Sequence, residues 1–548
     1  MRKTFDFSIT YRADGITHTI NRLKCDHFEI VITEKEEVMK ATIYPKCEIS
    51  ILDISMSCTH LYMPDSKIFV NGYQSWTNTR EFFVDEKMER SKGILRFIPI
   101  AKTYGDENFI KYPPRGVFHG FTYGYIRDYT KVHLYGSMTE AAGYTIIKFD
   151  TKHNAVIIKK DLEGVKISAP YEIFNLGYFE GEYDEVFDRY FSLQNLPGLR
   201  MKSATGYTTW YNYYTKVTRD DVEKDLQGFK DVGITPMFFQ IDDGWQTHVG
   251  DWLNVKPEFG NMKELTDKIH SYGIRAGLWL APFACFTNSK LYKEHPDWLI
   301  RNAKGKLVKG GISWYPISNY YVLDILHPGV QEYLRKVFDT ILNEWGFDMV
   351  KLDFLYAQCQ VPRQNKSRGQ IMCEAMDFLR SCVGNKLILG CGVPLGPSFG
   401  KVDFCRIGCD VRLNWGENFI DRMLCRESPS TVSTLNNTIF RRHLNGRAFV
   451  NDPDVFYLRN YNIKMNDEQK TIVADINKLF GGVLFVSDRV STYDEKKLDT
   501  LRDIFKEDEI EIIDAEYITK SVISITYTIN GIEQELVFDI QLGKIIRG

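Results

Sequence analysis

Two aspartates, Asp353 and Asp410, follow separate apolar runs of the sequence, where a carboxylate could act as a nucleophile or as an acid. Glycoside hydrolysis needs such a pair, because one carboxylate attacks the anomeric carbon while a protonated one assists the departing oxygen. An aspartate after a strand can also do no more than cap the following loop. The pair therefore predicts a glycosidase if both carboxyl groups reach one pocket. A gap of about 5–5.5 Å between them would indicate retention, and about 6.5–9.5 Å would indicate inversion.

A basic residue accompanies each of these acids. Lys351 lies two positions before Asp353, so on a strand both side chains point to the same face. A buried Lys–Asp pair is costly unless it is paired or used, so Lys351 forms a structural salt bridge or keeps Asp353 ionised for attack. Arg406 lies four positions before Asp410, close enough to act on its carboxylate.

Other polar and aromatic residues admit both a structural and a functional interpretation. Asp242 and Asp243 follow the run 237–241 and could cap the next loop or bind two sugar hydroxyls. Cys391 has no apparent histidine neighbour, which favours a packing or substrate-lining thiol over a nucleophile. Trp76 lies in a β-rich stretch and would by default be a core residue of that domain.

The elements that must position these residues fall into three predicted domains. Residues 1–198 are rich in short β-branched and aromatic runs separated by turns, which predicts an antiparallel β-sandwich. Leu196-Pro197-Gly198 is the predicted boundary. Residues 199–490 alternate short apolar runs with helical periodicity, and residues 491–548 return to β character in a predicted antiparallel domain. The fold class is therefore multidomain α/β plus β.

The middle domain predicts a (β/α)₈ TIM barrel, because eight strand-like runs occur in it with mostly helical material between them. A doubly wound sheet is the competing fold, but the glycine-rich phosphate-binding turn expected after its first strand is missing. The chemistry of a barrel lies at the C-terminal ends of its strands, and the acids described above follow such ends. The predicted strands are 207–210, 237–241, 275–280, 349–353, 387–391, 404–408, 448–451 and 482–486.

Neither a metal site nor a cofactor is predicted. None of the 11 histidines lies at the end of a predicted barrel strand, and neither HxH nor HExxH spacing occurs. Aspartates at strand ends could hold Mg²⁺, but the positive charges of Lys351 and Arg406 oppose it.

Composition and charge exclude several classes of partner. The chain has 548 residues, 44% of them hydrophobic and 26% charged, as in globular proteins of two or three domains. The net charge of −3 provides no electrostatic footprint for nucleic acid or for an anionic membrane. No signal peptide begins the sequence, and the 11 cysteines are odd in number and irregular in spacing. These features predict reduced thiols and a cytoplasmic protein.

At the predicted strand ends the sequence resembles glycoside hydrolase family 36, the α-galactosidases, especially the compact bacterial type. The resemblance covers nearly the whole chain, and many separate motifs occur in the family's order. It implies an N-terminal β-supersandwich, a catalytic barrel and a C-terminal antiparallel β domain. The motifs are TGYTTWYNYY (205–214), FFQIDDGWQ (238–246), GDWL (250–253), GLWLAPF (277–283), EHPDWL (294–299), KLDFLYA (351–357), LILGCGVPLGP (387–397), RIGCDVRLNWGE (406–417) and VNDPD (450–454).

The resemblance also implies a role for each matched residue. Asp353 matches the nucleophile and Asp410 the general acid/base of a retaining mechanism. The remaining matches imply substrate binding. Asp242 and Asp243 would bind the galactose O4 and O6 hydroxyls, and Lys351 and Arg406 would hold ring hydroxyls. Trp279 would form a wall of the pocket, and Cys391 and Gly392 would line its O2 side. Trp76 would reach the site from the N-terminal domain, and Tyr211 would add a contact at the exit of the first strand.

The implied function is a retaining α-galactosidase acting on an α-galactoside substrate, and a homo-oligomer is a further expectation. Its alternatives are an α-N-acetylgalactosaminidase or an α-galactosyl transferase of the same fold, and a non-catalytic galactoside-binding protein. Two stretches depart from the family pattern, Thr208-Thr209 before the first Trp and 411–414 after Asp410. Arg412 lies near the leaving-group side, so it puts the aglycone preference in doubt more than the reaction.

Overall fold

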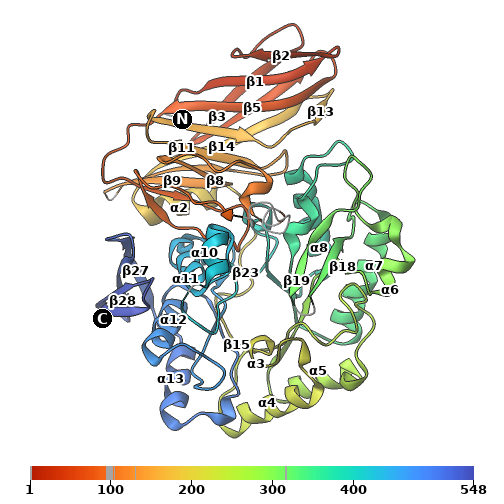
Figure 1. The fold of residues 1–548 in the computed structure, drawn as a ribbon, viewed down its shortest axis with the longest axis vertical. Helices are drawn as coiled ribbons and strands as arrows, with labels where there is room; N and C mark the ends of the chain where they lie inside the picture. Colours follow the sequence, from red (N-terminus) through yellow and green to blue (C-terminus); the bar gives the residue numbers. More distant parts are fainter. Residues whose placement is uncertain (1–2, 94–102, 104, 130, 315–316, 417) are drawn as a thin grey trace.

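The protein is represented by a computed structural model that describes residues 3–93, 103, 105–129, 131–314, 317–416 and 418–548. Three parts follow one another along the chain, namely a β-sandwich, an α/β barrel and a small β-sheet (Figure 1). The predicted fold class is confirmed. The boundaries predicted at 198 and 490 stay predictions.

The N-terminal part consists of two antiparallel sheets that share a core of alternating apolar side chains, such as Ile9, Ile54 and Phe174. One sheet has the order β2 (Ile16–Ile20), β1 (Asp6–Ala13), β5 (Ile49–Thr59), β12 (Ala155–Lys160), β11 (Thr145–Asp150), β8 (Val117–Phe121), with β13 (Lys166–Ile167) also pairing with β5. The other has the order β3 (Phe28–Lys35), β4 (Val38–Pro45), β14 (Tyr171–Gly181), β10 (Lys131–Ser137), β9 (Tyr123–Asp128), β6 (Lys67–Val70), β7 (Glu81–Phe83).

The barrel is built on a parallel sheet whose strands follow chain order. Such an order lacks the reversal of a doubly wound sheet, so that alternative is excluded. The strands are β15 (Ala204–Thr208), β16 (Phe238–Ile241), β17 (Arg275–Leu280), β21 (Met349–Leu352), β22 (Leu387–Gly390), β23 (Phe404–Arg406), β24 (Val450–Asp452), β25 (Val455–Phe456) and β26 (Val483–Val486).

The seventh strand of the barrel is broken in two. β24 pairs with β23, whereas β25 pairs with β26, which in turn pairs with β15. Pro453 and Asp454 form the break, and Asp454 has a positive φ of 79°. The two short halves therefore close the barrel from opposite sides.

The first barrel strand differs from its prediction. It spans Ala204–Thr208 instead of 207–210, and Trp210 opens the short helix α3 (Trp210–Tyr213). Trp210 suited a strand by its aromatic character, but the chain leaves the sheet at Thr209, whose N–H donates to the Gln240 carbonyl at 3.2 Å. The other predicted strands overlap the observed ones.

The barrel helices begin at side-chain caps that the sequence provides. Thr218 and Asp221 form a capping box at the start of α4, and Ser367 caps α8. The longer helices are α4 (Arg219–Asp231), α5 (Met262–Ser271), α7 (Pro328–Asp339), α8 (Arg368–Val383), α11 (Thr431–Phe440), α12 (Asp467–Phe480) and α13 (Glu495–Phe505). Helix α2 (Tyr183–Ser192) belongs to the N-terminal part and packs beside β14. The short helical elements include α6 (Lys290–Glu294), α9 (Leu395–Ser398), α10 (Phe419–Leu424), η2 (Asp106–Asn108), η3 (Tyr214–Lys216), η4 (Pro257–Phe259), η5 (Pro296–Trp298), η6 (Thr340–Glu344), η7 (Leu355–Cys359), η8 (Cys425–Glu427), η9 (Arg442–Leu444) and η10 (Val490–Thr492).

Two smaller antiparallel sheets complete the fold. One, which sequence patterns did not predict, is inserted between β17 and α7 and has the order β18 (Ala284–Phe286), β20 (Ile317–Val322), β19 (Lys309–Trp314). The other, C-terminal, sheet comprises β27 (Ile510–Tyr517), β28 (Val522–Ile529), β29 (Ile532–Asp539) and β30 (Lys544–Arg547).

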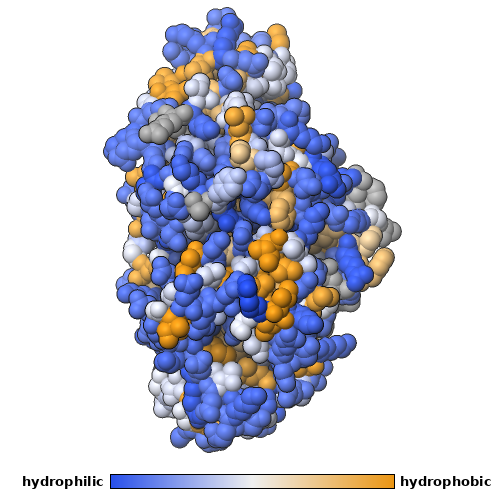
Figure 2. All heavy atoms as spheres, turned by 90° about the vertical axis from the view of Figure 1, so that its left-hand side faces the viewer, coloured by the Kyte–Doolittle hydropathy of each residue, from blue (hydrophilic) through white to orange (hydrophobic). Residues whose placement is uncertain are grey.

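The C-terminal sheet packs beside α11 and α12, where the Tyr517 ring stacks on Phe440 at 5.4 Å (Figure 1). The face of the molecule on this side is mainly hydrophilic, with small separate hydrophobic patches (Figure 2). All 11 cysteines are free thiols. Among the described residues, every helix is too short or too polar to cross a membrane.

Candidate active site

The acids singled out in the sequence follow the C-terminal ends of barrel strands. Asp353 follows β21, Asp242 and Asp243 follow β16, and Arg406 ends β23. Because these strands are parallel members of one barrel, their ends form one rim. The strand ends therefore bring these polar side chains to the same mouth of the barrel.

Asp353 is held through both carboxylate oxygens. The indole N–H of Trp279 donates to Oδ2 at 3.1 Å, and the backbone N–H of Phe354 donates to Oδ1 at 2.8 Å. Burial raises the pKa of Asp353; the charge of Lys351 opposes this shift, and the charge of Asp410 adds to it. A fixed carboxylate that is still half-buried is suited to nucleophilic attack.

The negative charge of Asp410 contributes to the raised pKa of Asp353. Its side chain is 52% exposed, and its Oδ1 lies 2.7 Å from Arg406 Nη2. Asp410 is therefore open to a substrate while Arg406 fixes its orientation.

Lys351 forms its direct ion pair with Asp242 and not with Asp353. Its Nζ lies 2.8 Å from Asp242 Oδ2, and the Gln240 amide donates to the same oxygen at 2.7 Å. Both charged side chains are buried, at 7% and 2% exposure. β16 and β21 are alternate strands, whose inward side chains share a layer in a barrel, and this explains the pairing. The two-residue spacing predicts Asp353 as the partner, and the structure corrects this to Asp242.

Asp243 has a different environment from its neighbour. Its Oδ1 accepts a hydrogen bond from the Gln246 amide at 2.6 Å. Burial raises the pKa of Asp243 to about 7, and the charges of Asp242 and Asp353 act in the same direction. The capping interpretation holds in part for Asp242, because its Oδ1 accepts the N–H of Asp243 at 2.9 Å.

Trp76 packs against the barrel and not within the sandwich core, so the default core interpretation is wrong. Its ring meets Phe354 and Tyr356 edge to face, with centroids 5.6 and 5.5 Å apart. The adjacent Ser75 N–H donates to the Val393 carbonyl at 3.0 Å. The loop between β6 and β7 therefore carries Trp76 from the N-terminal domain to the barrel mouth.

Gly392 is closely covered by this tryptophan. Its φ is +52°, and a Cβ at this position would lie 2.8 Å from Trp76 Cζ2. The preceding Cys391 is 1% exposed, and burial raises the pKa of its thiol well above the usual value. A neutral thiol is a poor nucleophile, which favours the lining role over catalysis.

One residue of the site, Asp454, is visible in the sequence as an acid at a strand end, but no role was predicted for it. Asp454 Oδ2 lies 2.6 Å from Arg406 Nη2 and accepts hydrogen bonds from the Tyr211 hydroxyl and the Val411 N–H. Burial raises the pKa of Asp454 to about 7. Arg406 thus bridges Asp454 and Asp410, and Tyr211 contacts Asp454. The signal was the VNDPD motif, whose acids lie at a strand end.

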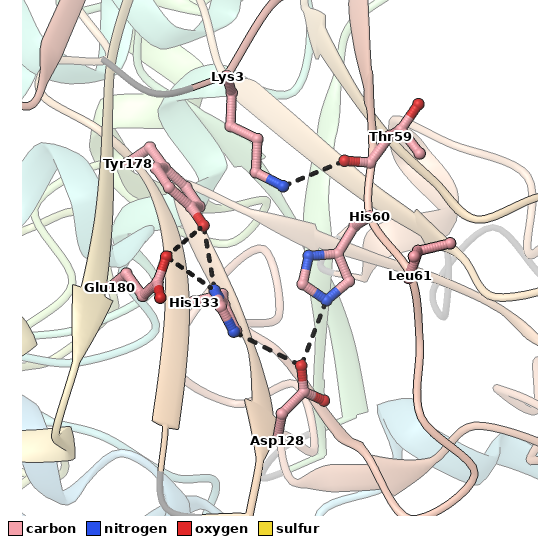
Figure 3. Close-up of a pocket in the computed structure, with 8 residues that line it drawn as sticks. All are labelled: Lys3, Thr59, His60, Leu61, Asp128, His133, Tyr178 and Glu180. Atoms are coloured by element: carbon pink, nitrogen blue, oxygen red, sulfur yellow. Dashed lines mark hydrogen bonds and ion pairs between the residues drawn. The ribbon is translucent and has the colours of Figure 1, made fainter.

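No group of three or more His, Cys, Asp or Glu side chains in the described residues is arranged to hold a metal ion. A cavity of about 440 Å³ lies in the N-terminal sandwich, where His60 and His133 each place Nε2 3.5 Å from Asp128 Oδ2 (Figure 3). Its lining contains none of the barrel residues described above. This cavity is therefore separate from the carboxylate pair.

Residues 206–376 match the family model described as Melibiase. Over 152 residues the chain is 30% identical to "Alpha-galactosidase Mel36A" of Lactobacillus acidophilus, covering 26% of this chain and 20% of that protein. It is 28% identical over 173 residues to "A type blood alpha-D-galactosamine galactosaminidase" of Flavonifractor plautii, covering 28% of this chain and 16% of that protein. The matches thus span about a fifth of the curated relatives' length.

Among the solved structures that share the fold are two α-galactosidases of bacteria. TtGalA, an α-galactosidase from Thermus thermophilus, superposes with a TM-score of 0.74 at 22% identity, covering 98% of this chain and 100% of that one. The glycoside hydrolase family 36 α-galactosidase AgaA from Geobacillus stearothermophilus gives 0.62 at 12% identity, covering 96% and 78%. The Melibiase match thus lies inside the barrel, and the fold of these two α-galactosidase structures extends over almost the whole chain.

Proposed function

We propose that this protein is a retaining α-galactosidase that releases terminal α-linked galactose, with Asp353 as nucleophile and Asp410 as general acid/base. The observation that carries the proposal is the geometry of Asp353. Trp279 and the backbone N–H of Phe354 fix both of its oxygens, and the half-exposed Asp410 is near enough to raise its pKa. The family match and the names of the relatives support the choice of galactose.

The reaction is a double displacement. Asp353 attacks C1 of the α-galactosyl unit while Asp410 gives its proton to the departing oxygen. The ionised Asp410 then takes a proton from water, which attacks the glycosyl-enzyme and restores Asp353. α-Galactose leaves with the configuration it had in the substrate.

The remaining polar side chains bind the sugar in this proposal. Asp242 and Asp243 accept hydrogen bonds from two hydroxyls, and Lys351, already 2.8 Å from Asp242, donates to a third. Trp76 and Trp279 supply apolar walls, which suit the C–H faces of a pyranose. TtGalA has been solved in complexes with p-nitrophenyl α-galactopyranoside and with stachyose, which makes both compounds suitable first substrates.

Azide rescue tests the two catalytic roles separately. Asp353→Ala is expected to lose turnover of an aryl α-galactoside and to regain it with azide, which yields the β-galactosyl azide. Asp410→Ala is expected to yield the α-galactosyl azide from a substrate with a good leaving group, because the intact nucleophile still forms the intermediate. Full activity of Asp353→Ala without azide, or azide products of the opposite configuration, would refute the assignment.

The galactosaminidase name of one relative favours an α-N-acetylgalactosaminidase as a second candidate. A 2-acetamido group would need space beside Cys391 and Gly392, where the Trp76 ring already lies. We therefore expect the aryl α-galactoside to be hydrolysed faster than its N-acetyl analogue. Product analysis with excess acceptor sugar separates hydrolysis from galactosyl transfer. Location in the cytoplasm and homo-oligomer formation stay predictions of the sequence.

A further inference from the structure

The loop that carries Trp76 is held from the barrel side by one buried arginine, Arg441. This residue lies between α11 and η9 and has 0% exposure. Its guanidinium donates to the backbone carbonyls of Ser75 at 2.6 Å and Gln74 at 3.3 Å, the two residues before Trp76. It also donates to Asn71 Oδ1 and Thr79 Oγ1, each at 3.0 Å. The guanidinium therefore binds the loop near both ends and at its centre.

The same guanidinium contacts the segment that follows β23 and leads to the proposed acid/base, Asp410. Arg441 Nη1 donates to the Ile407 carbonyl at 2.6 Å, one residue after Arg406. Arg406 in turn binds Asp410 at 2.7 Å. A single side chain thus joins the Trp76 loop of one domain to the β23 exit of the other.

The chemistry of this contact is unusual for a buried cation. All five of these acceptors are neutral oxygens, although a buried charge is normally paired with a carboxylate. Burial lowers the pKa of Arg441 to about 10, which still leaves the side chain charged at neutral pH. A planar fork of five N–H donors can satisfy several carbonyls at fixed angles, which a lysine ammonium cannot.

We propose that Arg441 is a positioning residue for the sugar site, which holds Trp76 in register with Arg406 and Asp410 across the domain boundary. The inference rests on the proposed function, because it assumes that Trp76 contacts a galactosyl unit. It assigns Arg441 no contact with substrate. Its effect on the sugar must therefore pass through the Trp76 loop.

Arg441→Lys keeps the positive charge but removes the planar guanidinium with its five N–H donors. We expect it to weaken galactose binding, measured as Kd by calorimetry, by about 10- to 100-fold, the loss typical of charged hydrogen bonds. Arg442→Lys is the matched control, since Arg442 lies next in the chain, donates to Ile439 O and covers the Tyr183 ring. Its Kd should stay close to that of the parent. Equal Kd values for the parent and Arg441→Lys would overturn the proposal.

A double-mutant cycle separates positioning from general stability. If Arg441 acts through Trp76, the double variant Trp76→Ala/Arg441→Lys should bind galactose no more weakly than Trp76→Ala alone. Additive losses would show that Arg441 acts elsewhere, and the proposal would fail.

A measurement without sugar distinguishes failure of this inference from failure of the proposed function. The nine tryptophans can be labelled as 5-fluorotryptophan, and the Trp76 signal in the ¹⁹F spectrum is identified by its loss in Trp76→Phe. We expect this signal to shift or broaden in Arg441→Lys and to stay in place in Arg442→Lys. If Arg441→Lys does not fold, Thr79→Val removes one acceptor while retaining the arginine, and should shift the signal in the same way. An unchanged Trp76 signal in folded Arg441→Lys, or in Thr79→Val where Arg441→Lys does not fold, would refute the inference, even if the parent neither bound nor hydrolysed galactosides.

Discussion

Lys351 Nζ lies 2.8 Å from Asp242 Oδ2, so the ion pair joins β21 to the exit of β16 inside the barrel mouth. Gln240 adds a hydrogen bond to the same oxygen, and Lys351 also exerts its charge on Asp353 without contacting it directly. The Lys351 ammonium therefore neutralises the charge of the buried Asp242 and also lowers the pKa of Asp353, the proposed nucleophile.

Lys351→Met should destabilise the protein and shift its pH profile. The variant leaves Asp242 buried without its cation, and breaking such a pair costs about 3–5 kcal/mol of unfolding free energy. The pKa of Asp353 should also rise, which moves the acidic limb of kcat/KM to higher pH. Urea unfolding and a pH–rate profile measure both effects. Lys351→Met/Asp242→Asn serves as control and should recover part of the stability, whereas a single variant as stable as the parent would contradict the expectation.

The acidic limb of the pH profile reports the ionisation of Asp353. The carboxylate must be ionised to attack, so kcat/KM should fall as pH drops through its pKa. Burial and the charge of Asp410 place that pKa above the ordinary value of 3.8. Asp410→Asn removes one negative charge, so the limb should move to lower pH.

This shift is best measured with an aryl α-galactoside whose leaving group needs no protonation, because Asp410→Asn then still forms the glycosyl-enzyme. Single-turnover rates across pH isolate the attack step. A limb that stays in place or moves to higher pH would show that Asp410 carries no charge that raises the pKa of Asp353 over this pH range.

The strand ends were predictable from the sequence because each apolar run there stops at a polar or aromatic residue. The runs before Asp242 and Asp353 are buried strands, as the barrel pattern requires. The partner of Lys351 was not predictable, because Asp242 lies 109 positions away and only the closure of the barrel brings the two together. Trp76 likewise looked like a core residue, since its approach to the barrel depends on how two domains pack.

The insertion β18–β20 escaped prediction for a different reason. Its strands pair with one another and not with the barrel, so they interrupt the alternation of strand and helix. Asp454 is visible at the end of a predicted strand, but its role depends on the break between β24 and β25. The sequence pattern predicts one continuous strand there and gives no sign of the break.

Asp454→Asn should reduce activity without a large loss of fold. Of its two carboxylate partners, Asp410 and Asp454, Arg406 would keep only Asp410. The orientation of its guanidinium would then be less constrained. Loss of one charged hydrogen bond, worth about 1.5–3 kcal/mol, predicts a fall in kcat/KM of about 10- to 100-fold. Tyr211→Phe removes only the hydroxyl bonded to Asp454 and should have a smaller effect. If folded Asp454→Asn had the kcat/KM of the parent, the ion pair between Arg406 and Asp454 would not be needed for activity.

Gly392→Ala should disturb the site through Trp76. The added Cβ would lie 2.8 Å from Trp76 Cζ2, so the indole must move, and the φ of +52° adds backbone strain of about 1–2 kcal/mol. We expect KM for an aryl α-galactoside to rise, because the displaced ring no longer covers the sugar. Gly233→Ala is the matched control, since its φ is +67° and a Cβ there would meet nothing within 4 Å. It should lose a similar amount of unfolding free energy and keep the parent KM. If both alanine variants give the same KM, the contact between Gly392 and Trp76 does not shape the sugar site.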